Sequence, residues 1–491
     1  MNPPDAAPSV VHSRTRTARL IGNTASLVTN DLVNRAITFV LYALIARYLG
    51  AYEFGQMSIT LIIFYLLQSL APMGLKMLLV RETARNPQNS GAYLVQGSLV
   101  SLAASILAIW LVFGFLSIMN YAEDTTWIIM LISFGLIPYS LSAVCEAIFQ
   151  AHEQIRWITL ANVPVSLLRG LAAFWMLSAG LDLRWIGILF LVTFTITWLL
   201  EWILLTRHIA PPNWSGPPAL FVQIARMAVP FIGLQGIIAI TNSILPLFLS
   251  KSSGEVQVGL FNAANQIMAP VLLVSQSVVV SLFPRLCQKY DTGQHALRQT
   301  TDRLTELLFA VTVPAVIGLI FYARFVLLLI YDKEIFAISA LLLQVMACSL
   351  LFRAITSVLG RVLMASGRER TLLRILIIET IICLALAFTL IPRWGVLGAA
   401  LAGLIVTFFD LVLHLPPIFR LLGGLSLGRS AWKAINASLV LIIWLVFAMG
   451  VQLNPWLGIL VSLFLYPVVW LILALLESGG WRRLLERYAL R

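Results

Sequence analysis

Long apolar runs separated by short polar stretches follow one another along the whole chain. A transmembrane helix needs about 20 consecutive, mainly apolar residues, because the hydrocarbon core of a bilayer is about 30 Å thick. The pattern therefore predicts an all-α integral membrane protein with about 14 transmembrane helices. The fourteen runs lie at about 20–48, 55–80, 92–119, 126–150, 157–179, 185–206, 226–250, 257–286, 303–330, 335–364, 372–391, 396–419, 431–451 and 456–476.

The composition supports a membrane protein, since 60% of the 491 residues are hydrophobic and only 11% are charged. A soluble domain carries roughly 25% charged residues, and it would have too much surface to hide so many apolar side chains. The net charge of +12 could indicate a nucleic-acid partner in a soluble protein. Here the basic residues stand in short loops between apolar runs, which favours contact with membrane lipids and predicts no nucleic-acid partner.

Lys and Arg are unevenly distributed among the connections between the predicted spans. Both termini and the even-numbered connections carry 22 of the 33 basic residues, whereas the odd-numbered connections carry 5. Cytoplasmic loops of membrane proteins are enriched in Lys and Arg. The pattern therefore predicts a multi-pass protein of the inner (plasma) membrane with both termini in the cytoplasm.

Two halves of the chain show a weak internal repeat. Residues 151–156 resemble 365–370, Gly187 corresponds to Gly398, and Glu201 and Asp410 lie at matching depths in spans six and twelve. An even number of spans per half makes such repeats parallel, which predicts two pseudo-symmetric six-helix bundles and two extra C-terminal helices. The predicted parts are a cytoplasmic tail at 1–19, lobes at 20–206 and 226–420, a cytoplasmic linker at 207–225, and two helices with a cytoplasmic tail at 421–491.

Polar side chains in the first span form one candidate site. Asn30, Asp31, Asn34 and Arg35 recur at helical spacing, and such a stripe must face a cavity or another helix rather than lipid. Asp31 and Arg35 are four residues apart and could neutralise each other within the span. The stripe thus indicates either a cavity wall that contacts a charged headgroup or a structural ion pair. Asn262 and Asn265 occupy span eight of the other half, where substrate contact and interhelical hydrogen bonding are both open.

Further charged residues at membrane depth need a reason to be there, since each costs about 2.5–3.5 kcal/mol on insertion scales. We expect Arg169, Arg353 and Arg361 to bind phosphate or carboxylate groups, because a guanidinium holds such oxygens with two hydrogen bonds. Lys76 is a further cavity candidate. The alternative is pairing of these cations with buried acids, for which the sequence offers Glu146, Glu379 and Asp410.

The remaining acids at depth allow other roles. Asp31, Glu201 and Asp410 are candidates for binding a coupling proton or cation, and Glu201 and Asp410 have no obvious local partner. Asp302 and Glu306 lie near Arg298 and Arg303, which favours a solvated, salt-bridged face. The chain has no nucleotide-binding loop, no HExxH and no GxSxG motif. We therefore predict a protein that is not an enzyme and needs no metal or cofactor.

The opening region resembles the Wzx-type polysaccharide flippases of the multidrug/oligosaccharidyl-lipid/polysaccharide exporter superfamily. That family has a similar ar-x-LG-x-x-x-[FY]G pattern at the end of span one and a GL…R-x-x-A pattern near span two. The residues that carry the resemblance are 30–35, Ala46-Arg47-Tyr48-Leu49-Gly50, Phe54-Gly55, Gly74-Leu75 and Arg81-Glu82-Thr83-Ala84-Arg85.

The resemblance implies a flippase that moves a polyprenyl-pyrophosphate-linked oligosaccharide, a polysaccharide or lipopolysaccharide precursor, across the inner membrane by alternating access. It also suggests a polysaccharide polymerase and chain-length proteins as partners. A cation-coupled multidrug antiporter of the same superfamily is the main alternative, and a lipid II flippase is another. A membrane glycosyltransferase or polymerase would need large outside loops, which the chain lacks.

Overall fold

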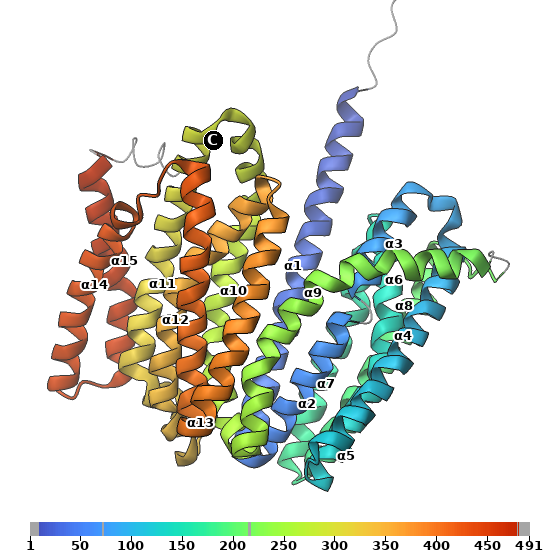
Figure 1. Ribbon diagram of the computed structural model, residues 1–491, viewed down its shortest axis with the longest axis horizontal. Helices are drawn as coiled ribbons and strands as arrows, with labels where there is room; N and C mark the ends of the chain where they lie inside the picture. The colour runs from blue at the N-terminus through green and yellow to red at the C-terminus, as the bar shows by residue number, and fades with distance from the viewer. Residues whose placement is uncertain (1–8, 71–72, 215–217, 479, 481–491) are drawn as a thin grey trace, which may run out of the picture. The chain divides into compact units, whose positions relative to one another are not determined.

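The computed structural model describes residues 9–70, 73–214, 218–478 and 480, and this part of the chain is helical with no β-strand. The chain divides into two compact units, Met1–Ser243 and Ile244–Arg491. Figure 1 shows the long helices of each unit, coloured along the chain. The predicted fold class, an all-α membrane protein, is confirmed.

The first unit contains the helices that correspond to the first six predicted spans. The predicted second span is built from α2 and α3, and the fourth from α5 and α6, which meet at Gly135. The elements are α1 (Ser9–Tyr48), α2 (Ala51–Leu70), α3 (Met73–Arg85), η1 (Pro87–Asn89), α4 (Ser90–Met119), α5 (Glu123–Phe134), α6 (Leu136–Ala151), α7 (Arg156–Ser178), α8 (Leu183–His208) and the beginning of α9 (Pro218–Ser253).

The second unit contains the end of α9 and all later helices. The long helix α13 holds two predicted spans, 372–391 and 396–419, and breaks at Gly395, whose φ of 54° and ψ of −130° are not helical. The elements are α10 (Glu255–Thr292), α11 (Gln294–Tyr331), η2 (Glu334–Ile338), α12 (Ser339–Ala365), α13 (Glu369–Leu422), α14 (Leu427–Gly450) and α15 (Pro455–Ser478).

The helices have the length and composition needed to cross a membrane. Eleven helices of the described residues qualify, and one of them, α13, carries two predicted spans. The other two predicted spans, about 20–48 and 226–250, lie in α1 and α9. Large apolar side chains face outward, for example Trp110, which is 67% exposed, and Leu476, which is 75% exposed. Such a surface is stable in lipid and would aggregate in water.

The two units repeat one packing pattern. In the first, α5 and α6 together pack against α2, α3, α4 and α8. In the second, α12 packs against α10, α11 and α13. The fourth span of each half is therefore its central helix, as a parallel repeat requires. The two extra helices α14 and α15 pack on each other and on α11, around a core that includes Tyr322, Leu441 and Tyr466.

Candidate functional site

The polar stripe of α1 is fixed partly within α1 and partly by α7. Arg35 Nε donates to both carboxylate oxygens of Asp31 at 2.9 Å, and the two side chains are 53% and 57% exposed. Asn34 donates to Asn30, and its own carbonyl oxygen accepts a hydrogen bond from Ser166 of α7. Asn34 thus joins two helices, whereas the Asp31–Arg35 pair stays on an accessible face of the unit.

Arg169 of α7 has no carboxylate within ion-pair distance among the described residues. Its guanidinium lies 5.1 Å from the ring centroid of Phe190 and 6.0 Å from that of Phe194, both on α8. Its buried Nε has no hydrogen-bond partner in the described part of the chain. Tyr65 of α2 is near both Arg169 and Arg35. The first unit therefore brings these two arginines to one region, and Arg169 retains unused donors for an anion.

A chain of polar contacts crosses the first unit from α3 to α8. Lys76 of α3 forms an ion pair with Glu146 of α6. The side-chain amide of Asn162 on α7 donates to Glu146 at 3.2 Å and to Glu201 of α8 at 3.1 Å. Glu201 is completely buried and also accepts a hydrogen bond from Ser142 at 2.5 Å. Lys76 therefore has an acid partner, while Glu201 has neutral donors that no local sequence spacing indicates.

The two arginines of α12 turn toward different neighbours. Arg353 is exposed on its helix and has electrostatic contacts with Glu379 and Asp410, which lie on the two parts of α13. Arg361 lies 5.6 Å from the ring centroid of Phe283 on α10. Asn262 of α10 is buried, whereas Asn265, one turn further on, is exposed. Of these four residues, Arg353 is therefore the one in electrostatic contact with the acids of α13.

Asp410 has a local partner that the sequence analysis did not identify. His414, one turn further along α13, places Nδ1 3.0 Å from a carboxylate oxygen of Asp410. The i, i+4 spacing of these two residues is visible in the sequence, but an isolated histidine in an apolar run carries little signal by itself.

The predicted solvated face around Asp302 and Glu306 is wrong for Glu306. Glu306 is buried, and it accepts from Lys433 of α14 at 2.5 Å. Lys433 also pairs with Glu477 of α15 at 2.5 Å. Because Lys433 stands near a predicted span end, its charge looked like a topology signal, but it joins α11, α14 and α15. Asp302 is half-buried and accepts from the backbone N–H of Ser426 at 3.1 Å.

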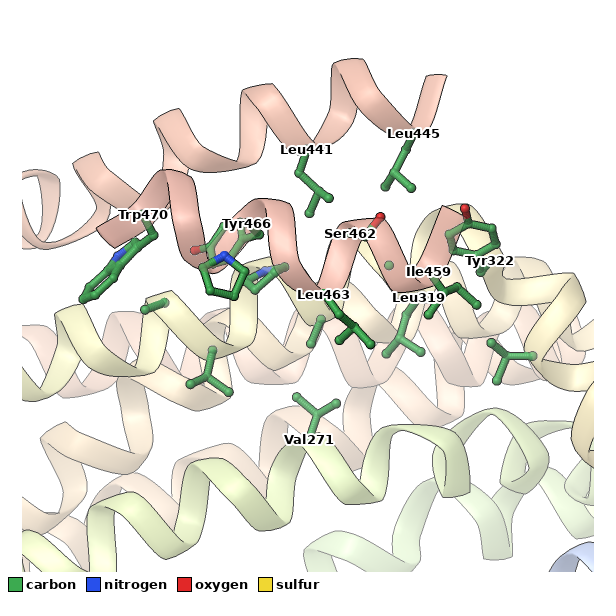
Figure 2. Close-up of a pocket in the computed structure, with 17 residues that line it drawn as sticks. Val271, Leu319, Tyr322, Leu441, Leu445, Ile459, Ser462, Leu463, Tyr466 and Trp470 are labelled. Atoms are coloured by element: carbon green, nitrogen blue, oxygen red, sulfur yellow. The ribbon is translucent and has the colours of Figure 1, made fainter. Parts of the chain in front are cut away.

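An apolar cavity of about 540 Å³ lies between α11 and the two extra helices. Figure 2 shows Leu463, Tyr466 and Trp470 of α15 on one side of it and Val271 of α10 opposite. Gly458 lets α15 approach closely, since a Cβ there would lie 2.2 Å from the Tyr322 hydroxyl oxygen. The polar side-chain atoms of the lining belong to Tyr322, Ser462, Tyr466 and Trp470. The lining is otherwise apolar and contains no charged side chain, so the cavity suits a hydrocarbon chain rather than a phosphate.

Comparison with known proteins identifies the class. The model of the polysaccharide biosynthesis protein family matches residues 20–289, and the model of the lipid II flippase MurJ matches residues 172–469. The protein named probable low-salt glycan biosynthesis flippase Agl15, from Haloferax volcanii, is 21% identical over 78% of this chain and 80% of its own.

Two solved structures share the fold. The inward closed conformation of lipid II flippase MurJ superposes with a TM-score of 0.73 at 16% identity, covering 92% of this chain and 98% of its own. An inward-facing multidrug resistance MATE transporter superposes with a TM-score of 0.62 at 14% identity, covering 79% and 95%.

Each of the two family models spans more than half of the chain. The chain therefore belongs to the polysaccharide biosynthesis protein family, as a Wzx-type flippase of the multidrug/oligosaccharidyl-lipid/polysaccharide exporter superfamily, and residues 172–469 also carry the MurJ family pattern. This confirms the resemblance seen in the opening 90 residues. The protein is a multi-pass membrane protein of a transporter family.

Proposed function

We propose that the protein flips a polyprenyl-pyrophosphate-linked oligosaccharide across the inner membrane by alternating access. The observation that carries the proposal is Arg169, a guanidinium at membrane depth that has aromatic neighbours but no acid partner among the described residues. An unpaired cation at that depth is costly unless it binds something. A pyrophosphate supplies oxygens that a guanidinium holds well, and membership of a polysaccharide flippase family supplies the substrate class.

Arg35 in the first unit and Arg353 in the second are further proposed anion-binding residues. Both are accessible, and each is balanced by acids that a phosphate could replace: Asp31 for Arg35, and Glu379 with Asp410 for Arg353. Lys76 and Arg361 are retained as weaker candidates, because Lys76 is paired with Glu146 and Arg361 lies over Phe283. Asn30, Asn34, Asn262 and Asn265 would bind sugar hydroxyl groups by hydrogen bonding.

The apolar cavity beside α14 and α15 supports the lipid part of the proposed substrate. A polyprenyl chain is a methyl-branched, unsaturated hydrocarbon, and the cavity is lined by apolar side chains such as Leu319, Leu445 and Leu463. A tail held there would keep the lipid attached to the protein while its headgroup crosses.

The topology and partners belong to the same proposal. We place both termini and the linker at 207–225 in the cytoplasm, with lobes at 20–206 and 226–420, a tail at 1–19, and the two added helices and a tail at 421–491. The linker is supported by the end of α8 at His208 and the beginning of α9 at Pro218. Delivery of a lipid-linked oligosaccharide to the outer face also implies a polysaccharide polymerase and chain-length proteins as partners.

A cation-coupled multidrug antiporter is the second candidate, supported by the fold shared with MATE transporters. A cationic drug would need an acid without a cation in the cavity. In the first unit Asp31 and Glu146 are each paired with a cation, and Glu201, which has only neutral hydrogen-bond donors among the described residues, is completely buried. Arg169 has no acid partner among the described residues. The arrangement favours an anionic substrate.

Deletion of the gene and complementation with Arg169→Ala and Arg353→Ala test the proposed function. We expect the deletion to abolish surface polysaccharide and to accumulate lipid-linked oligosaccharide at the cytoplasmic face. We expect both variants to complement poorly at normal protein levels, with a loss of at least tenfold.

Arg184→Ala is the matched control for Arg169→Ala. Arg184 also lies over an aromatic ring, 5.5 Å from the centroid of Trp127, but it stands exposed at the start of α8. It should complement fully. If the deletion strain keeps its surface glycan and becomes sensitive to cationic dyes, the flippase proposal is wrong and the antiporter is the better assignment.

A further inference from the structure

The second part of α13 contains a buried carboxylate–imidazole pair. The side chain of His414 is 4% exposed and that of Asp410 is 14% exposed. Nδ1 of His414 lies 3.0 Å from the Asp410 carboxylate and 2.9 Å from the Asp410 backbone carbonyl oxygen. A backbone carbonyl only accepts hydrogen bonds, so Nδ1 carries the hydrogen. Neutral His414 is therefore held in the tautomer whose basic nitrogen is Nε2.

The basic nitrogen of this pair is buried and unused. Nε2 of His414 has no hydrogen-bond partner in the part of the chain that the structure describes. It faces Gly360 of α12, where a Cβ would lie 3.7 Å away. The lone pair of Nε2 therefore points at Gly360, the one position of α12 that has no side chain. A buried polar atom without a partner costs about 1–3 kcal/mol, so it needs a reason.

The acids near His414 lie on α13 itself, and α12, which packs against α13, adds a cation close to both acids. Asp410 and Glu379 lie on the two parts of α13, and Arg353 lies on α12. Cys383 faces Glu379 from the same turn region of α13. Two carboxylates and one guanidinium leave one negative charge without a counter-ion when the imidazole is neutral. With both carboxylates ionised, a proton on Nε2 would balance the charge of this cluster.

We propose that Nε2 of His414 is a proton-binding site and that its occupancy changes how strongly Glu379 and Asp410 hold Arg353. When Nε2 is protonated, the imidazolium takes over part of the attraction of the two acids. Arg353 is then freer to bind an anion, and by linkage an anion on Arg353 favours the proton. The proton site stands on its own geometry, whereas its use in transport rests on the proposed function.

Nitrogen NMR of the full chain labelled at histidine tests the site without any transported lipid. The chain has five histidines, so the signal missing in His414→Gln assigns His414. We expect Nε2 of His414 to gain a proton between about pH 8 and pH 5, the range in which imidazole changes charge. In Asp410→Asn the titration should move to lower pH by about one unit or more, because a carboxylate stabilises the charged ring. In Arg353→Gln it should move to higher pH.

His208 is a matched internal control. Its Nδ1 also lies 2.9 Å from the backbone carbonyl oxygen four residues earlier, but it is exposed and has no carboxylate partner among the residues that the structure describes. Its NMR signal should be the same in Asp410→Asn and Arg353→Gln as in the wild type. If the His414 ring stays neutral down to pH 5, the proposed proton site is wrong. If the titration of His414 is the same in Arg353→Gln as in the wild type, the proposed link to Arg353 is wrong. If Asp410→Asn does not fold, the wild-type and Arg353→Gln titrations still decide. None of these outcomes depends on the substrate.

Discussion

At the scale of single residues, buried charges in this protein depend on partners from other helices. Glu146 and Glu201 share the amide of Asn162, yet only Glu146 has a cation, Lys76. Glu201 accepts hydrogen bonds only from the neutral side chains of Ser142 and Asn162 among the described residues, and a buried charge without an ion pair is costly. The charge of Glu146 therefore neutralises Lys76, whereas Glu201 has no ion pair to lose, although both are acids in apolar runs.

This difference predicts opposite results for two conservative variants. Glu201→Gln should fold with nearly the wild-type melting temperature in detergent, since a neutral carboxyl group and an amide are similar in size and hydrogen bonding. Glu146→Gln leaves Lys76 half-buried without its counter-ion and should lower stability by roughly 1–3 kcal/mol, because the pair is only partly buried. Thermal unfolding of both purified variants measures the contrast. Equal melting temperatures would show that Glu201 carries a charge like Glu146.

The residue-level predictions from the sequence were reliable only where partners are close in the chain. The pair Asp31–Arg35 follows from its i, i+4 spacing. The contacts of Glu306 with Lys433 do not, because the two residues are 127 positions apart. Depth in a span can be estimated from hydropathy, but the neighbour that a side chain meets is set by how helices pack.

At the scale of elements, glycines decide where the long helix α13 turns back. Gly395 has a φ of 54° with a ψ of −130°, a combination that is open essentially only to glycine. A Cβ on Gly398 would lie 2.2 Å from the backbone oxygen of Leu390. The two spans of α13 therefore fold back at a turn that side chains would block.

We predict that Gly395→Ala and Gly398→Ala each reduce the yield of folded protein severalfold. The measurement is fluorescence-detected size-exclusion chromatography of tagged protein after detergent extraction. Gly428→Ala, at the start of α14, is the control, because a Cβ there meets nothing within 4 Å. Normal folding of all three variants would contradict the proposed role of the turn.

At the scale of the whole molecule, the distribution of basic residues predicts which ends of the helices face the cytoplasm. The helix α8 offers a direct test, because Arg184 and Arg207 are exposed near its opposite ends. The charge pattern places Arg184 outside and Arg207 inside. In a variant without the four native cysteines, Arg184→Cys should react with a membrane-impermeant maleimide on intact spheroplasts.

Arg207→Cys is the paired variant of that experiment. It should react only after the membrane is permeabilised, since the reagent cannot cross the bilayer. If Arg207→Cys alone reacts in intact spheroplasts, α8 has the opposite orientation. If both variants react there, α8 does not cross the membrane as predicted.

The sequence by itself determined the membrane class, the positions of the spans and the family. These properties are local or additive: twenty apolar residues are enough to make a span, and a motif of a few residues is enough to show a resemblance. Tertiary structure decided which charges are paired, as with Lys76 and Glu146, and which are left available, as with Arg169. It also decided that Nε2 of His414 faces Gly360 and has no hydrogen-bond partner among the described residues. Such contacts depend on how helices distant in sequence rotate and pack, and hydropathy along one chain carries no information on that rotation.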